Sequence, residues 1–413
     1  MPSFPLFERF GVELEYMIVD ARTLRVRPWA DRLIRHAGGT VEDGVTRGPL
    51  AWSNELALHL IELKTGQPAT RLEGLDRAFQ AEVRHINDLL ARDGARLLPT
   101  AMHPWMDPHR ESRLWPHECG EIYRAFDRIF DCRGHGWTNL QSTHLNLPFA
   151  DDSEFERLHT AIRLLLPLLP ALAASSPFIE GRPAPNLDQR LAEYRRNCAR
   201  IPSVSGQVVP ESIPSPAAYR RRILEQIYRD LAPHDPEGVL HHEWANARGA
   251  IARFDRGTIE IRVLDIQECP AADLAILQAI VAVLRLLTDH SLSPAAAQRR
   301  ASTDDLADLL RRATRIGARA RVSQPAILRA FSADPARRWN VRDLWRHLLT
   351  LAGTQGAPWR PWIDRILEQG TLAERILRAT GPRPSRSRLR AVYRQLADRL
   401  AAGDAWEAPG SDL

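Results

Sequence analysis

The sequence predicts an α+β fold, in which short strands with one polar face alternate with long apolar or amphipathic helices. Four segments show the period-two alternation of strands, and residues 70–94 and 271–290 place apolar residues at helical spacing. The chain has 413 residues, 44% of them hydrophobic and 26% charged. This composition is typical of a globular protein that buries a large core.

The first predicted strand is residues 10–20, which are rich in Val, Ile and Tyr. Because strand side chains alternate between faces, Glu13 and Glu15 share one face, and the apolar residues from Val12 to Ile18 share the other. Two neighbouring carboxylates repel each other unless solvent or a cation lies between them. The pair is therefore either a solvated strand face or one wall of a metal site.

A second strand is predicted over residues 54–65, after a loop or hairpin over residues 21–49. Glu62 lies between two aliphatic residues of this strand and is expected to face a site or a partner rather than the core. Glu55 lies seven residues earlier, so in an unbroken strand it would point to the opposite face. A bend or bulge is required if both glutamates converge.

Helices separate the next strands. The first one, over residues 70–94, begins with the capping-box pattern Thr70-x-x-Glu73, and a second is predicted over residues 118–131. The apolar run 161–174 predicts a buried helix that is kinked by its two prolines.

The third strand is residues 139–148, in which His144 and Asn146 share one face. A single histidine in a strand is either a structural residue with satisfied hydrogen bonds or a ligand. The fourth strand, residues 253–265, follows a turn and places Glu260 and Arg262 side by side. This pair could bind a cation and an anion, or could be a surface ion pair of little energetic value.

Residues 182–236 are rich in proline and arginine and contain one predicted helix, over residues 216–230. We interpret this segment as a lid that faces a substrate or as an ordered excursion. Its arginines are expected to be solvated, among them Arg190, Arg195 and Arg196. The run from His241 to Trp244 is a weak metal candidate, because adjacent histidines point apart on a helix or a strand.

The C-terminal part differs in charge. Residues 291–413 are rich in arginine, so we expect a core over residues 1–290 and a helical region over residues 291–413 that packs on it. The arginines are interspersed with acids and apolar residues at helical spacing, which favours a solvated helical face over a surface that binds nucleic acid. The prediction leaves room for a homo-oligomer.

Several classes of protein are excluded or disfavoured by composition. The chain shows no secretory leader and no long apolar span, so we expect a cytoplasmic protein that does not engage a membrane. Its cysteines, Cys119, Cys132, Cys198 and Cys269, lie far apart and are expected to be idle thiols. Lys64 is the only lysine and does not follow a Gly-x-x-x-x-Gly pattern, so a P-loop is excluded.

Together, the four strands would gather acids, an imidazole and an arginine on the face opposite their aliphatic residues. A cluster of carboxylates stays ionised only with cations, and oxygen-rich ligands favour Mg²⁺ or Mn²⁺. Such metals commonly bridge phosphates, and a neighbouring Arg262 would neutralise a phosphoryl group in transfer. The constellation predicts ATP-dependent phosphoryl transfer without a P-loop.

Five blocks of the chain resemble, in order, those of the type 2 glutamate-cysteine ligase or carboxylate-amine ligase family, which is related to glutamine synthetase. The blocks are residues 11–16, 61–65, 143–146, 171–178 with Gly181, and 257–265, and the resemblance covers roughly residues 8–290. It implies a mostly antiparallel sheet curved into a funnel, with helices on its outer side. One departure is Asn146, where many relatives carry a second histidine.

The resemblance also implies roles for single residues. The positions that would hold Mg²⁺ or Mn²⁺ are Glu13, Glu15, Glu55, Glu62, His144 and Glu260. Arg262 and Glu260 would be catalytic, and Arg262, His144 and Asn146 would contact ATP. The implied reaction activates the carboxylate of an amino acid, glutamate or a glutamyl group, as an acyl phosphate that an amine then attacks. Two alternatives stay open: an ATP-independent amide hydrolase or transferase on the same fold, and a non-catalytic binding protein.

Overall fold

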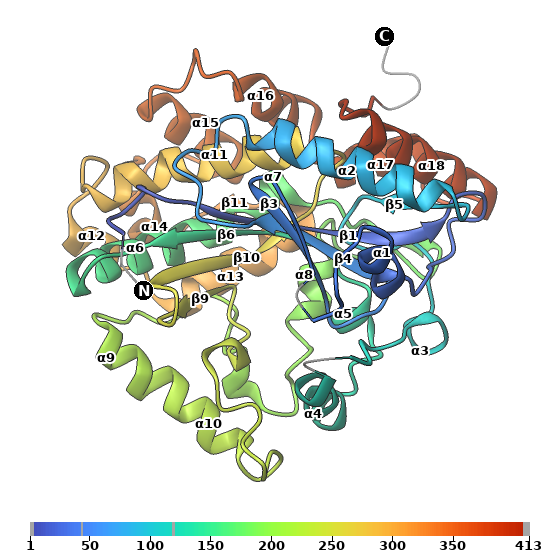
Figure 1. Ribbon diagram of the computed structural model, residues 1–413. Helices are drawn as coiled ribbons and strands as arrows, with labels where there is room; N and C mark the ends of the chain where they lie inside the picture. Colours follow the sequence, from blue (N-terminus) through green and yellow to red (C-terminus); the bar gives the residue numbers. More distant parts are fainter. Residues whose placement is uncertain (1–3, 43, 118–119, 408–413) are drawn as a thin grey trace.

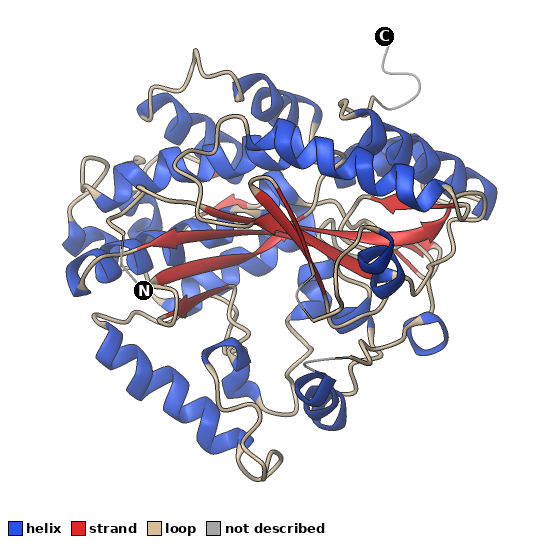
Figure 2. Ribbon diagram, viewed as in Figure 1, coloured by secondary structure: helices blue, strands red, loops and turns tan. Residues whose placement is uncertain are grey.

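The computed structural model describes residues 4–42, 44–117 and 120–407. Its centre is an eight-stranded sheet, twisted and curved, in the order β2-β3-β4-β1-β6-β10-β9, with β5 paired to the C-terminal residues of β1 (17–20); every pairing is antiparallel (Figures 1 and 2). The strands are β1 (Gly11–Asp20), β2 (Val45–Arg47), β3 (Leu50–Asn54), β4 (Leu60–Thr65), β5 (Ala95–Leu98), β6 (Ser142–Pro148), β9 (Ala250–Arg253) and β10 (Thr258–Asp265). The predicted α+β class with a curved antiparallel sheet is confirmed.

Helices cover one face of this sheet. In Figure 1, α2 (Leu75–Ala91) and α11 (Pro270–Thr288) lie along it, and α15 (Val341–Leu351) and α16 (Arg360–Gln369) pack outside α11. The aliphatic face of β1 enters this layer, where Val12 and Leu14 are fully buried. Burial of each such side chain contributes about 1.5–3 kcal/mol. The sheet is thereby fixed with its aliphatic side against helices and its other side free for polar groups.

Helix α11 is the one helix of the described chain that is long and apolar enough to cross a membrane. Most of it is buried inside the protein, against α2 and α6 (Asp152–Leu165). Its apolar surface is thus satisfied by the core, as expected for the central helix of a folded domain.

The end of the chain forms a second, smaller core. Helices α17 (Leu372–Thr380) and α18 (Arg386–Ala402) pack on each other, and α18 packs on β5 and α2. Tyr393 of α18 is buried with Met17 of β1, on the sheet face that carries Glu13 and Glu15 further along the strand. The arginine-rich region is therefore helical and packs on the sheet, whereas the division at residue 290 stays a prediction.

The remaining elements complete the molecule. They are α1 (Ala30–His36), α3 (Pro108–Glu111), α4 (Gly120–Phe130), α5 (His135–Thr138), α7 (Pro170–Ala173), α8 (Gln189–Tyr194), α9 (Pro216–Tyr219), α10 (Glu225–Leu231), α12 (Ala295–Arg299), α13 (Thr303–Ile316), α14 (Pro325–Ala330) and the short pairs β7 (Phe178–Ile179) with β8 (Arg182–Pro183) and β11 (Arg321–Val322) with β12 (Trp339–Asn340). Helices α4, α9 and α10 lie on the side of the sheet opposite α2 and α11 (Figure 1).

Several predicted elements differ from the structure. Residues 54–65 do not form one strand: β3 and β4 form an antiparallel pair, and Glu55 lies in their connection. Residues 21–49 contain α1 and β2 rather than only loops. The capping-box prediction at Thr70 is wrong, because α2 begins after Gly74, whose φ of 87° only glycine adopts readily.

Other predictions are confirmed. The prolines end α6 and separate it from α7 through a short 3₁₀ segment (Leu166–Leu168). The helix predicted over residues 118–131 is α4; residues 118 and 119, and with them Cys119, lie outside the described residues. The other three cysteines are buried free thiols.

Candidate active site

A cavity of about 550 Å³ lies on the polar face of the large sheet. Its walls include α4, α5, α8 and the segment around Trp244, which lie on the side opposite the helical layer. Polar side chains from five strands form its floor: Glu13, Glu15, Ser53, Glu62, Lys64, Ser142, His144, Glu260 and Arg262. The cavity therefore brings together side chains from segments that lie far apart in the sequence.

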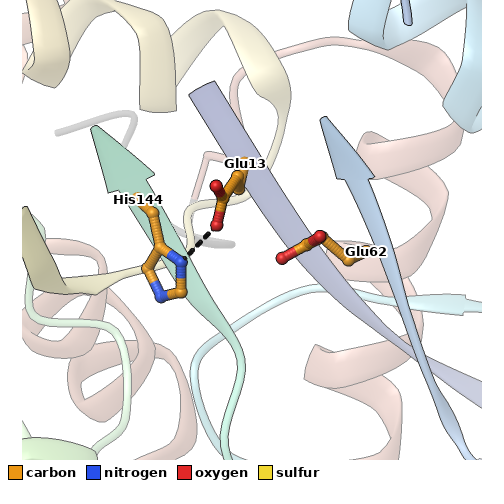
Figure 3. A group of neighbouring side chains, drawn as sticks. All are labelled: Glu13, Glu62 and His144. Atoms are coloured by element: carbon orange, nitrogen blue, oxygen red, sulfur yellow. Dashed lines mark hydrogen bonds and ion pairs between the residues drawn. The ribbon is translucent and has the colours of Figure 1, made fainter. Parts of the chain in front are cut away.

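The register of the strands explains why these side chains converge. In the β1–β4 pair Glu13 lies opposite Lys64 and Glu15 opposite Glu62, and in the β1–β6 pair Glu13 also lies opposite His144. Directly opposite residues point to the same face of a sheet. Figure 3 shows Glu13, Glu62 and His144 projecting from three neighbouring strands.

Close approach of β1 and β6 depends on Gly11. It lies opposite Asn146, and a β-carbon at position 11 would come within 2.9 Å of the Asn146 Cβ. The glycine therefore leaves room for the Asn146 side chain, whose Nδ2 donates to Oε1 of Glu13 at 3.1 Å.

His144 connects the acids of β1. Its Nδ1 lies 2.7 Å from Oε2 of Glu13 (Figure 3), and its Nε2 lies 2.9 Å from Oγ of Ser142. Burial would lower the pKa of His144, but the hydrogen bond with Glu13 and the charge of Glu15 raise it to about 9. Burial likewise opposes ionisation of Glu13, and its hydrogen bond with His144 holds the pKa of Glu13 below the usual value. The two groups form a buried ion pair.

Two further acids of the cavity, Glu15 and Glu55, are less fully compensated. Oε2 of Glu15 accepts hydrogen bonds from the backbone N–H and the hydroxyl of Ser142, yet burial raises its pKa. The pKa of Glu55 is raised well above its usual value by burial and by the charges of Glu62 and Glu15. The hairpin turn between β3 and β4 thus supplies the bend that convergence of Glu55 and Glu62 requires.

Glu260 and Arg262 of β10 belong to the same floor, on the strand next to β6. Oε1 of Glu260 lies 2.9 Å from Nε and 2.8 Å from Nη2 of Arg262, and its Oε2 lies 3.2 Å from Nη1 of Arg253. Burial would raise the pKa of Glu260, but Arg262, His144 and Arg253 lower it to about 2. The pairing of β10 with β6 shifts by one residue after Ile261, so Arg262 stands at a β-bulge. The buried ion pair fixes its guanidinium at the cavity.

The cluster fits a divalent cation. Within the described ranges, two groups of three side chains bring possible ligand atoms within 4.8 Å of one another: Glu13, Glu62 and His144, and Glu15, Glu55 and Glu62. No hydrogen-bond partner is found in the described chain for the buried Oδ1 of Asn146, which adds an unpaired oxygen beside Glu13. Sets dominated by oxygen suit Mg²⁺ and Mn²⁺. Glu260 lies in the same cavity but outside both groups.

The structure adds residues that sequence reasoning missed. Arg190, expected to be solvated, is 2% exposed, lines the cavity, and lies 3.6 Å from Asp265. Residues of α8 and of the turn after it thus line the cavity, whereas a role of the segment 182–236 as a lid that faces a substrate stays a prediction. Aromatic rings form the facing wall: Tyr123, Phe126, Trp137, Tyr194 and Trp244.

Neither of the two groups of possible metal ligands includes a residue of the run 241–244. Instead His242 stacks on Trp244, with ring centroids 5.4 Å apart, and Trp244 lines the cavity. Lys64 could have been found from the sequence, because it follows Glu62 by two residues and therefore shares its face.

Comparison with known proteins places these features in a family. The model of glutamate-cysteine ligase family 2 matches residues 9–395. The chain belongs to this family. The match continues past residue 290, where the resemblance visible in the sequence ends, so the C-terminal helices are included in what the family shares.

The chain is also similar to two curated proteins. An uncharacterized protein of Archaeoglobus fulgidus is 38% identical over 275 residues, which cover 67% of this chain and 73% of the relative. A protein of Rubrobacter xylanophilus, provisionally assigned as glutamate-cysteine ligase 2-3, is 27% identical over 270 residues, which cover 64% of this chain and 66% of the relative.

Solved structures share the fold. The glutamate-cysteine ligase of Francisella tularensis in complex with AMP superposes with a TM-score of 0.58 at 12% identity, covering 99% of this chain and 91% of that chain. A bifunctional glutathione synthetase from Pasteurella multocida gives a TM-score of 0.55 at 14% identity, covering 96% of this chain and 53% of that chain. The family fold therefore extends over nearly the whole chain, and the acid-lined cavity lies within it.

Proposed function

We propose that the protein is an ATP- and Mg²⁺-dependent ligase that forms an amide between the carboxylate of an amino acid and an amine. The proposed acid is glutamate or a glutamyl group, and the proposed amine is cysteine or another amino compound. One observation carries the proposal: five glutamates, His144 and Arg262 line a single cavity on one sheet face. Its volume is in the range of small-molecule sites.

Mutually repelling carboxylates are costly in a folded protein, so their concentration in one cavity supports a role with cations. Glu13, Glu62 and His144, with Glu15 and Glu55, would hold the metal ions. When bound, Mg²⁺ supplies positive charge that neutralises phosphate oxygens. The metal-ligating roles of single residues, including Glu260, are part of this proposal.

The cavity residues suggest how the transfer would proceed. A substrate carboxylate oxygen attacks the γ-phosphorus of ATP, the bond to the β–γ bridging oxygen breaks, and an acyl phosphate and ADP form. Arg262, oriented by its two bonds to Glu260, would stabilise the negative charge of the phosphoryl group in transfer. The amine nitrogen then attacks the acyl carbon, phosphate leaves, and a cavity carboxylate accepts the proton that the amine loses.

His144 and Asn146 would contribute to ATP binding indirectly, by orienting the Glu13 carboxylate. Without a metal ion His144 carries a positive charge in its pair with Glu13, and it would have to lose this proton to become a metal ligand. Asn146 donates to the same carboxylate. Both side chains thereby fix the orientation of Glu13, as outer partners of a ligand do.

The test is an activity assay of the purified protein with Mg²⁺, ATP and pooled amino acids. We expect ADP release that requires both an acid and an amine, and a new amide detected by mass spectrometry. Glu13→Gln and Arg262→Ala should each reduce ADP release about a hundredfold or more. Glu82→Gln is the matched control, because Glu82 bonds Trp52 and Arg47 away from the cavity.

Three results would contradict the proposal. They are no ADP from the wild-type protein with any acid and amine, unchanged rates in both cavity variants, and formation or hydrolysis of an amide without ATP. The last result would instead support the hydrolase or transferase alternative.

A further inference from the structure

Lys64 is the only lysine in a chain with 56 lysine and arginine residues, and its side chain ends in the acid cluster. Its Nζ lies 2.8 Å from Oε1 of Glu62 and 2.7 Å from Oγ of Ser53. The Ser53 hydroxyl also donates to Oε1 of Glu62, at 2.9 Å. Two donors, one from β3 and one from β4, thus converge on a single carboxylate oxygen of Glu62.

Glu62 belongs to both groups of possible metal ligands. An oxygen that accepts from an ammonium group is less available to a divalent cation, and the two cations repel each other at short distance. Binding of a metal ion by Glu62 and retention of the bond with Lys64 therefore compete. This competition follows directly from the distances between Glu62, Lys64 and the other possible metal ligands.

A lysine side chain is well suited to a contact with Glu62 that must break when a metal ion binds. Arginine would hold the carboxylate through a planar fork with two parallel bonds, whereas an ammonium is a compact charge on a flexible stem. The Lys64 side chain is 36% exposed, so its ammonium has room to move away from Glu62 while it stays at the cavity.

We propose that Lys64 is the resident counter-ion of the acid cluster and that a divalent metal displaces it from Glu62. The released ammonium then faces the cavity and adds positive charge where the anionic substrates bind. Lys64 is in this sense a positioning residue that favours binding of the metal before the substrates. The inference rests on the metal site of the proposed function, but it concerns a contact of the protein that can be observed without turnover.

A single lysine makes the test direct. Protein labelled with ¹³C only in lysine should give one CεH₂ correlation in an NMR spectrum, assigned by its loss in Lys64→Met. Titration with Mg²⁺ should move this signal to a new position at saturation. In parallel, Mn²⁺ binding is measured by electron paramagnetic resonance in the absence of ATP.

Lys64→Met should bind Mn²⁺ about tenfold more tightly than the wild-type protein, because no ammonium has to leave. Arg47→Met is the matched control: Arg47 bonds Glu82 outside the cavity, and its loss should leave Mn²⁺ affinity unchanged. Circular dichroism checks that both variants are folded.

The outcomes separate the two proposals. Mn²⁺ binding that saturates while the Lys64 signal stays in place overturns the inference and leaves the metal site standing. If folded Lys64→Met binds Mn²⁺ as tightly as the wild-type protein or more weakly, the inference is also overturned and the metal site still stands. Absence of any Mn²⁺ binding overturns both the inference and the metal site.

Discussion

Glu15 and Glu62 occupy directly opposite positions of the β1–β4 pair, and both side chains are buried. Like charges directly across a strand pair destabilise a sheet. The cations near them are the paired His144, 3.7 Å from Glu15, and Lys64, bonded to Glu62. The fold therefore concentrates negative charge at a place where a bound cation would relieve repulsion.

The first prediction concerns the metal. Addition of Mg²⁺ or Mn²⁺ to protein freed of metal should raise the melting temperature, because a ligand that binds only the folded state stabilises it. Glu62→Gln should lose most of this rise, since Glu62 belongs to both ligand groups. Differential scanning fluorimetry with and without a chelator measures the effect. A metal-dependent rise of the same size in Glu62→Gln would count against the site.

The second prediction concerns Glu55. Its pKa is raised by burial and by Glu62 and Glu15, so its ionised form is disfavoured in the folded state. A carboxyl whose folded pKa is raised costs stability as the pH rises above its unfolded value, near 4.3. Without metal, Glu55→Gln should therefore raise the melting temperature at neutral pH, by about 2–4 °C, and have little effect at about pH 4. A lower melting temperature at neutral pH would show that Glu55 is stabilising.

Much of the site follows from the alternation of strand residues. Period-two spacing correctly placed Glu13, Glu15 and His144 on one face, because the aliphatic residues between them had to enter the core. Glu62 is on the same face for the same reason. The boundaries of β3 and β4 are harder to predict. The turn between them contains no glycine or proline, so the sequence pattern predicts a single strand over residues 54–65.

Arg190 shows why the rest was not predictable. It comes from a segment without strong periodicity, so its burial depends on where that segment docks on the sheet rather than on local pattern. Its ion-pair partner Asp265 lies on β10, which this segment meets only in the folded protein. The start of α2 likewise depends on the left-handed Gly74 rather than on the capping pattern at residues 70–73.

The third prediction concerns the acids beside Arg190. Oδ2 of Asp265 accepts from the backbone N–H of Ser175 and the hydroxyl of Ser176, and Oδ1 of Asp188 accepts from the N–H of Leu191. Burial raises the pKa of Asp188 well above its usual value, and Asp265 raises it further. The remaining oxygens are Oδ2 of Asp188 and Oδ1 of Asp265, and neither has another hydrogen-bond partner among the described residues. This arrangement indicates that the two carboxyl groups share one proton.

Asp188→Asn should therefore cost about 1 kcal/mol or less, because an amide replaces the protonated carboxyl. Asp265→Asn should cost on the order of 3 kcal/mol, since it removes the charge that faces the buried Arg190 guanidinium. Urea unfolding of the two variants measures the difference. Equal costs would show that the proton is not held mainly by Asp188.

The last prediction concerns stability in acid. Nε2 of His103 lies 2.7 Å from the carbonyl oxygen of Leu24, and its Nδ1 accepts from the backbone N–H groups of Trp105 and Met106. Protonation of Nδ1 would break both of these bonds. Burial lowers the pKa of His103 to about 3, whereas an unfolded histidine titrates near 6.5.

Between these two values the unfolded chain holds a proton that the folded protein does not. The contribution of His103 to the free energy of unfolding is thus fully present above about pH 6.5. It is lost as the pH falls, at about 1.4 kcal/mol per pH unit. His103→Gln preserves a donor and an acceptor without titrating, so its stability should fall less steeply between about pH 6.5 and 4. Urea unfolding across this range, with His109→Gln on the exposed α3 as control, measures the slope. Parallel pH profiles for wild-type protein and His103→Gln would show that His103 is not the group that is protonated on unfolding.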